Sequence, residues 1–187
     1  MNDAGFSRMI THAAASGATL LFPETHFDMV RIGIGLYGYW PSAEAAASYR
    51  RSRTKLKPVL TWKTVVGEVK KIPKGSCIGY DSTECVRASA AMAVLPVGYW
   101  HGFDRGLSSR GHVLIRGKRA RVLGRVSMDM IAVDVTKIFG VRVGDEVVII
   151  GRQGKDAIWA DEIAKKIDTT AYEVIARLNP LIQRREI

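Results

Sequence analysis

Three glycines at fixed spacing form the segment of this sequence best suited to hold a small anion. They follow a short apolar run at Met29–Ile34, in the pattern Gly33-x-Gly35-x-x-Gly38. Backbone N–H groups at a strand end or a helix start can point at one anion when the turn between them is tight. The segment therefore predicts either an anion-binding turn or a purely structural one.

The same glycine spacing is the fingerprint of dinucleotide-binding folds. Those folds need an acidic residue about twenty positions further along the chain, where it holds a ribose hydroxyl. Residues 53–63 contain neither Asp nor Glu. The sequence therefore disfavours a nucleotide site.

The chain is strongly basic, with a net charge of +10 from 28 Lys and Arg against 18 Asp and Glu. A basic excess can indicate nucleic-acid binding. Here the positive residues are spread along the chain and cluster only at Tyr49–Lys55. This distribution favours a solvated basic surface, helped by an anionic cofactor or substrate, over a nucleic-acid site.

The sequence contains no apolar run of about 18 residues and no signal peptide after Met1, so we expect no membrane span. Cys77 and Cys85 are the only cysteines, too few for a disulfide framework and without the spacing of zinc ligands. The four histidines are scattered, so no metal site is expected. These features predict a cytoplasmic, reduced protein.

The first fifty residues have the pattern of an α/β segment. Residues 6–20 suit a helix followed by a strand, and Met29–Ile34 suits a short buried strand that runs into the glycine turn. A helix is expected from Ala43, with Ser42 as its N-cap and Glu44 in its first turn. Strand, turn and helix make a βα unit, the repeating element of parallel α/β folds.

Beyond Lys57 the sequence changes to short runs of β-branched residues separated by Gly or Pro. This texture predicts an antiparallel sandwich or barrel, with hairpin turns at Arg116–Lys118 and Val143–Asp145. Two short helices follow, the second with a capping box of Thr170 and Glu173. We place the domain boundary near Arg53, between residues 1–53 and 54–187. The expected strands are 59–69, 90–97, 112–116, 119–123, 131–135 and 146–150, and the expected helices are 160–167 and 171–178.

Four segments together resemble the C-terminal portion of the alanine racemases, a fold type III family dependent on pyridoxal 5′-phosphate (PLP). They are His26–Gly38, Ile78–Asp81, Leu95–Tyr99 and Arg125–Met130. The resemblance runs from about Ser16 to Tyr172. It implies a mainly β C-terminal barrel or sandwich domain, preceded by the last βα units of an incomplete TIM-like α/β barrel.

By this resemblance, the PLP phosphate is bound by the Ser16 hydroxyl, the N–H groups of Gly33 and Ile34, and Tyr172. The family commonly has Asn before that serine, where this chain has Ala15. Arg31 is implied to face the pyridine nitrogen. A guanidinium stays protonated, so the ring nitrogen would stay neutral and the ring would be a weaker electron sink. A structural salt bridge is the alternative for this arginine.

Tyr80 resembles the tyrosine that transfers the α-proton on one face of alanine, opposite a lysine. Racemisation uses two bases on opposite faces, because a single base tends to return the proton to the face it left. A phenol has a pKa of about 10, so positive neighbours must lower it before it acts near neutrality. Met128 is implied to offer its N–H to the substrate carboxylate, and Tyr99 to narrow the substrate entrance with Tyr172.

The family's Schiff-base lysine lies in a Val-Lys-Ala-Asn-Ala-Tyr-Gly-like segment that this sequence lacks. The resemblance therefore implies the C-terminal part of an isomerase that interconverts L- and D-alanine for peptidoglycan precursors, inactive by itself. It also implies a homodimer, or pairing with an N-terminal barrel half. Three alternatives remain: a non-catalytic β-domain for dimerisation or binding, part of a serine or broad-specificity racemase, and a basic domain that binds nucleic acid.

Overall fold

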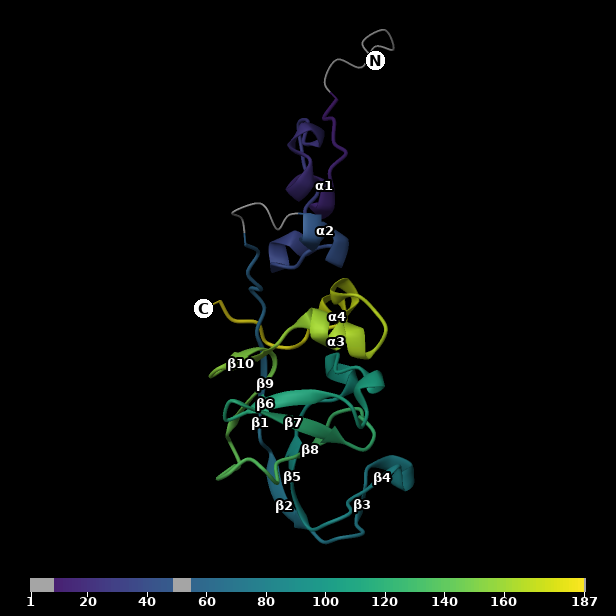
Figure 1. Cartoon of the computed structure of the whole chain (residues 1–187), viewed down its shortest axis with the longest axis vertical. Coiled ribbons are helices and arrows are strands. Elements are labelled where there is room, and N and C mark those ends of the chain that lie inside the picture. The colour runs from purple at the N-terminus through teal and green to yellow at the C-terminus, as the bar shows by residue number, and fades with distance from the viewer. Residues whose placement is uncertain (1–8, 49–54, 187) are drawn as a thin grey trace. The chain divides into compact units, whose positions relative to one another are not determined.

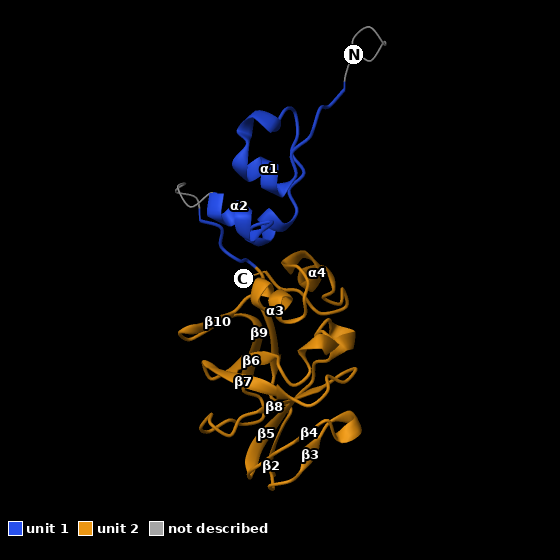
Figure 2. Ribbon diagram, turned by 45° about the vertical axis from the view of Figure 1, so that its right-hand side comes forward, with its two compact units in different colours: residues 1–59 blue, residues 60–187 orange. Residues whose placement is uncertain are grey.

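The computed structural model describes residues 9–48 and 55–186, which belong to two compact units. The first unit comprises residues 1–59 and the second residues 60–187 (Figure 2). The boundary expected near Arg53 lies outside the described residues.

The first unit is built from short helices around one parallel bridge, Ala15 to Arg31. The order expected over residues 6–20 was wrong in its described part, because extended backbone comes first and the helix starts at Ser16. The strand expected over 29–34 is reduced to the bridge, because only Arg31 has a strand partner there. Parallel pairing is still what a βα unit requires. The helices are α1 (Ser16–Leu21), η2 (Pro23–Thr25), η3 (Ile34–Tyr37) and α2 (Ala43–Ser48).

The helix expected from Ala43 is confirmed as α2. The Ala45 N–H donates to Ser42 Oγ at 3.1 Å, which is the expected N-cap bond. Hydrogen bonds from its own backbone N–H and from Ser42 lower the pKa of Glu44. An acidic side chain in the first turn complements the helix dipole.

The second unit is antiparallel and mainly β, as the sequence predicted (Figure 1). Its large sheet has eight strands, two more than the six runs expected. Its order is β1-β9-β6-β7-β8-β5-β2, with β10 also paired to β9. A separate two-stranded ladder joins β3 (Cys77–Ile78) to β4 (Glu84–Cys85). The sheet strands are β1 (Trp62–Val65), β2 (Glu68–Ile72), β5 (Ala90–Leu95), β6 (His112–Ile115), β7 (Lys118–Leu123), β8 (Ile131–Asp134), β9 (Glu146–Gln153) and β10 (Asp156–Ile158).

The strands at the two ends of this order are neighbours in the sequence. Only Val66 and Gly67 separate β1 from β2, so the sheet has to curve until its ends meet. The Val66 N–H donates to the Asp145 carbonyl before β9, and the Gly67 N–H donates to the Val94 carbonyl in β5. These two bonds attach the connection to both ends of the sheet and make its outline barrel-like.

The core follows from the burial pattern of the strands. In β8, Ile131 and Val133 are buried and alternate with half-buried neighbours, as in a strand with one covered face. In β9, all four residues from Val147 to Ile150 are fully buried, so both faces of this strand are covered. The side chains of Val113, Leu114 and Ile115 in β6 are fully buried as well.

One of the two expected hairpin turns is confirmed, and the other differs from the observed structure. Arg116 and Gly117 have positive φ and form the predicted hairpin turn between β6 and β7. The turn at Val143–Asp145 is not a hairpin, because the strands on either side of it, β8 and β9, do not pair.

The terminal helices are α3 (Ala160–Lys166) and α4 (Ala171–Ala176). The capping box expected at Thr170 is wrong, because that side chain makes no cap hydrogen bond. The hydroxyl of the preceding Thr169 donates to the Glu173 carboxylate instead.

The expectation of reduced cysteines was also wrong. The β3–β4 ladder sets Cys77 directly opposite Cys85, with their Cα atoms 3.9 Å apart, and the two sulfurs form a disulfide. In the described part of the chain, no helix is long and apolar enough to cross a membrane. Over the same residues, no group of three or more His, Cys, Asp or Glu side chains could hold a metal ion.

The burial of β6 allows a direct test of the core. Leu114→Ala removes a fully buried side chain, so we expect it to lower the free energy of unfolding by about 2–5 kcal/mol. Leu181→Ala is the matched control, because Leu181 is 78% exposed, and should change stability by less than about 0.5 kcal/mol. Urea denaturation measures both. Equal effects of the two substitutions would contradict this assignment of the core.

Candidate functional site

Ser16 and the glycine turn form a small polar cradle in the first unit. The Ala15–Arg31 bridge brings the start of α1 beside the start of η3. Ser16 Oγ accepts the N–H of Gly33 at 2.9 Å and the N–H of Gly35 at 3.3 Å. Among the described residues, the intervening Ile34 N–H has no recorded acceptor.

The cradle has the chemistry of an anion site. Ser16 is only 4% exposed, yet its hydroxyl can both accept and donate a hydrogen bond. Consecutive backbone N–H groups at a turn suit the oxygens of a phosphate. Sequence analysis assigned Ser16, Gly33 and Ile34 to a phosphate, and the structure brings these three together. The Gly33 N–H donates to Ser16, so among the described residues the Ile34 N–H and the Ser16 hydroxyl proton are the donors left for an anion. The residues present therefore fit such a group.

Arg31 lies at the bridge itself and its side chain is exposed. Its Nε donates to His12 Nδ1 at 3.1 Å, and its Nη2 donates to the Ala13 carbonyl at 3.4 Å. The structural alternative was a salt bridge, but no described carboxylate lies within ion-pair distance of this guanidinium. Arg31 is therefore a permanent donor with no anionic partner among the described residues.

In the second unit, strand register places two loops with predicted site residues at one end of the sheet. Leu95, the last residue of β5, pairs with Ile131, the first residue of β8. Leu123, the last residue of β7, pairs with Ala132. The loop after β5 and the loop between β7 and β8 therefore leave from the same edge. These two loops carry Tyr99 and Met128.

Backbone bonds hold these two loops together. The Tyr99 N–H donates to the Ser127 carbonyl, and the Trp100 N–H to the Met128 carbonyl, both at 3.0 Å. A Cβ at Gly98 would lie 2.3 Å from the Met128 carbonyl oxygen, so only glycine permits this approach. Tyr99 and Met128 are 42% and 50% exposed. In the described residues, the Met128 N–H has no recorded acceptor and is available to a ligand.

Tyr80 begins η5 (Tyr80–Ser82), in the loop between β3 and β4, and its side chain is 68% exposed. The next residue, Asp81, forms an ion pair with Arg125 at 2.7 Å. Arg125 lies just beyond β7, so the loop between β3 and β4 contacts the sheet edge from which the Met128 loop leaves. Arg125, which contacts this segment, is thus already paired with a carboxylate.

Glu84 anchors the other end of the Tyr80 loop, a role that sequence analysis missed. Its carboxylate accepts from Arg121 Nη2 at 2.5 Å and from the Gly124 N–H at 2.8 Å. Burial opposes its ionisation, but the hydrogen bonds from Arg121 and Gly124 outweigh burial and lower the pKa of Glu84. No local signal pointed to this contact, because Glu84 and Arg121 lie 37 positions apart in the sequence.

Tyr172 is the second residue of α4 and is 44% exposed. The helix is tied to the loop that follows Tyr99, because Arg177 Nη1 lies 2.6 Å from Asp104 Oδ2. The predicted catalytic, cofactor-binding and substrate-binding residues therefore fall into two groups. The first unit carries Ser16, Arg31, Gly33 and Ile34, whereas the second carries Tyr172 together with Tyr80, Tyr99 and Met128.

The chain combines a short unit with one parallel β-bridge and a polar cradle with a mainly antiparallel β-domain. This combination narrows the class of protein to enzymes built from a parallel α/β domain and a β-domain. The family description "Alanine racemase, C-terminal domain" matches residues 59–186, and "Alanine racemase, N-terminal domain" matches residues 1–41. The chain belongs to the alanine racemase family.

Known alanine racemases are similar to this chain in sequence and in structure. An alanine racemase of Leptospira interrogans is 45% identical over 183 residues, covering 96% of this chain and 47% of the relative. The crystal structure of the Bacillus anthracis alanine racemase with bound L-Ala-P has a TM-score of 0.85 and 36% identity, covering 95% of this chain and 44% of that one. The enzyme of Streptomyces lavendulae has a TM-score of 0.84 and 35% identity, covering 96% and 46%. The chain thus spans about half the length of the relatives it matches.

The lowered pKa of Glu84 predicts a pH-dependent contribution to stability. Because the folded-state pKa lies below the ordinary value of 4.5, the contribution is complete above pH 4.5 and is lost as the pH falls through the folded-state pKa. We expect Glu84→Gln to lower the free energy of unfolding by about 1–3 kcal/mol at pH 7.

The difference between the wild type and Glu84→Gln should shrink in acid, as urea titrations at several pH values would show. Glu68→Gln is the control, because the Glu68 side chain is 50% exposed and its pair with Lys70 contributes little. A Glu84→Gln effect that is constant from pH 7 to pH 3 would contradict the assignment.

Proposed function

We propose that this chain is the C-terminal part of a PLP-dependent alanine racemase that interconverts L- and D-alanine by two-base α-proton transfer. The observation that carries the proposal is the cradle of Ser16 and the glycine turn, combined with membership of the family. Between the two N–H groups that Ser16 accepts, the Ile34 N–H has no acceptor among the described residues, and it is the group that an anion at this turn would meet.

The cradle would hold the phosphate of PLP through Ser16, Gly33 and Ile34, with Tyr172 as a further donor. Arg31 would face the ring nitrogen as a donor that does not give up its proton. Bound PLP supplies one function, the delocalisation of the electron pair left on the α-carbon when its proton is removed. Met128 would orient the substrate carboxylate through its free N–H, and Tyr99 would narrow the entrance.

Tyr80 would accept and return the α-proton on one face of alanine. Its side chain is exposed on a loop anchored by two ion pairs, Asp81 with Arg125 and Glu84 with Arg121. A lysine in a segment not found in this sequence would serve the opposite face. We therefore propose a homodimer, or association with an N-terminal barrel half, and a cytoplasmic protein that supplies D-alanine for peptidoglycan precursors. No nucleic acid and no membrane is part of this function.

The first test concerns the 187-residue chain by itself. Without the lysine segment it should racemise neither enantiomer, yet the cradle should retain weak, reversible affinity for PLP. Ser16→Ala removes one hydrogen-bonding group from an anion, so we expect about tenfold weaker binding in a fluorescence titration. Ser48→Ala, an exposed serine in α2, is the control and should bind PLP as the wild type does.

Alanine turnover by the chain alone, with PLP attached to one of its own lysines, would contradict this prediction. Equal PLP affinity of the wild type and Ser16→Ala would show that the cradle does not contribute to cofactor binding.

The second test addresses Tyr80 directly, in the chain fused to or co-expressed with a lysine-bearing N-terminal half. Tyr80→Phe keeps the ring and removes the ionisable oxygen, so folding and PLP binding should change little. Exchange of the α-proton for deuterium should slow by about 10²–10⁴-fold from one alanine enantiomer and persist from the other. Exchange has to be measured separately for each enantiomer, by mass spectrometry.

Tyr37→Phe supplies the control, because no role is assigned to that phenol. Equal slowing for both enantiomers, or no slowing, would reduce Tyr80 to a structural tyrosine. Parallel assays with L- and D-serine would separate a strict alanine racemase from a broad-specificity enzyme.

A further inference from the structure

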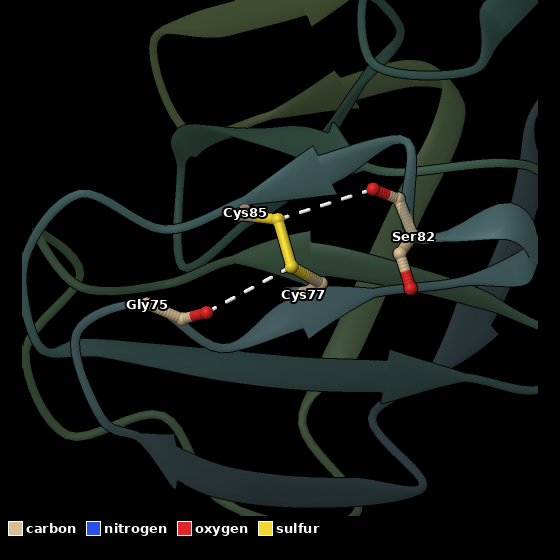
Figure 3. Close-up of a disulfide and its surroundings, with 4 residues drawn as sticks. All are labelled: Gly75, Cys77, Ser82 and Cys85. Atoms are coloured by element: carbon tan, nitrogen blue, oxygen red, sulfur yellow. Dashed lines mark hydrogen bonds between the residues drawn. A yellow bond between two sulfur atoms is a disulfide. The ribbon is translucent and has the colours of Figure 1, made fainter.

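The loop that carries Tyr80 is closed at its base by the disulfide between Cys77 and Cys85. Figure 3 shows the two sulfurs joined across the short β3–β4 ladder. This ladder pairs only two residues on each strand and is separate from the large sheet. So short a ladder is marginal without further support. Further pairing comes from the Gly75 N–H to the Val86 carbonyl and from the Val86 N–H to the Ser76 carbonyl.

The backbone of the segment closed by the Cys77–Cys85 disulfide is held in unfavourable conformations. Asp81 and Ser82 have φ values of +59° and +50°, in the left-handed region that favours glycine. Two consecutive residues of this kind persist only where the surroundings impose them. An open loop would relax towards more favourable backbone angles and would carry Tyr80 with it.

The two sides of the loop are anchored unequally. On the β4 side, Glu84 is largely shielded and binds Arg121 and the Gly124 N–H. At the tip, the Asp81–Arg125 pair is exposed, with side chains 65% and 41% accessible, so it contributes little by itself. On the β3 side, Ile78 is buried against Gly124, but Cys77 is exposed and is tied to β4 by its disulfide.

We propose that Cys77 and Cys85 are positioning residues, whose disulfide holds Tyr80 where it transfers the α-proton, so that a dithiol reductant lowers activity. The inference rests on the proposed role of Tyr80. Both cysteines are exposed and accessible to such a reductant. Reduction breaks the sulfur–sulfur bond, the dithiol gives up two electrons and becomes a cyclic disulfide, and its two protons end on the Cys77 and Cys85 thiols.

The reduced state has acceptors for both new thiols. Cys77 Sγ lies 3.7 Å from the Gly75 carbonyl, and Cys85 Sγ lies 3.9 Å from the Ser82 carbonyl. A disulfide sulfur has no proton to donate, so these become hydrogen bonds only after reduction. Reduction should therefore loosen the loop without unfolding the domain. Disulfides in cytosolic proteins are usually transient and either catalytic or redox-sensing, in keeping with this role.

The first experiment can be done on the isolated chain and does not require racemase activity. Hydrogen–deuterium exchange of residues 79–84 is compared in the oxidised chain, the dithiothreitol-treated chain and the double variant Cys77→Ser/Cys85→Ser. We expect about tenfold faster exchange in the last two samples, with strands β6 and β9 unchanged. The double variant should not respond to dithiothreitol. Equal exchange in all three samples would overturn the proposal.

The second experiment uses the restored racemase and measures α-deuterium exchange from each enantiomer. Reduction should slow exchange on the face served by Tyr80 about tenfold, mainly through kcat, and leave the lysine face unchanged. The double variant should match the reduced enzyme with and without dithiothreitol. Equal slowing on both faces would indicate general damage and overturn the positioning role.

The two proposals fail in different ways. If Tyr80→Phe affects both enantiomers equally, the catalytic role of Tyr80 is lost, but the exchange rates of residues 79–84 still test the disulfide. If Tyr80→Phe behaves as expected and reduction has no effect, the proposed function stands and the positioning role of the disulfide is wrong.

Discussion

The two-residue connection between β1 and β2 is the constraint on which the second unit depends. Strands at opposite ends of the hydrogen-bonded order have to meet, because Val66 and Gly67 leave no room for a crossover. The sheet therefore curves, and the interior of the curve collects the apolar side chains of β6 and β9. The curvature of the sheet and the position of the core both follow from this short connection. The Val66 and Gly67 N–H groups fix it by donating to the carbonyls of Asp145 and Val94.

The same curvature and register explain why the loops with the predicted site residues meet at one end of the sheet. Antiparallel neighbours alternate direction, so the end of β7, the start of β8 and the end of β5 share a side of the sheet. The loops of Tyr99 and Met128 then need a close approach, which Gly98 allows. Gly124 has the same role beneath Tyr80, because a Cβ there would lie 2.5 Å from the Ile78 carbonyl oxygen. The exposed rings of Tyr80 and Tyr99 therefore belong to loops whose backbone is held by close contacts and hydrogen bonds.

Sequence reasoning succeeded where the physics is local. Runs of β-branched residues predicted most strands of the sheet, Ser42 predicted the N-cap of α2, and Arg116–Gly117 predicted a hairpin turn. The run expected over 59–69 is two strands, β1 and β2, and β10 was not expected. It failed where the answer depends on a distant partner. Val143–Asp145 does reverse the chain, but a turn signal does not say which strands pair.

The candidate site shows the same limit. Family motifs drew attention to Tyr80, but nothing local indicated that Glu84 contacts Arg121, 37 positions away. The disulfide escaped for a similar reason. Two cysteines eight residues apart form no framework by spacing, and only the β3–β4 register sets them opposite one another. Within residues 77–85, the segments on either side of Tyr80 are too short to show the alternating pattern of a strand.

Under the proposed function, the chemistry is divided between two units that are each complete locally. The cradle of Ser16 lies beside the Ala15–Arg31 bridge, and the loop of Tyr80 contacts Arg121, the Gly124 N–H and Arg125 within the second unit. Neither group contains both an anion site and a proton-transfer residue. A racemase built this way needs residues from both groups, and each group keeps its geometry through its own hydrogen bonds. Preorganising both halves before assembly limits the conformational entropy lost when the site forms.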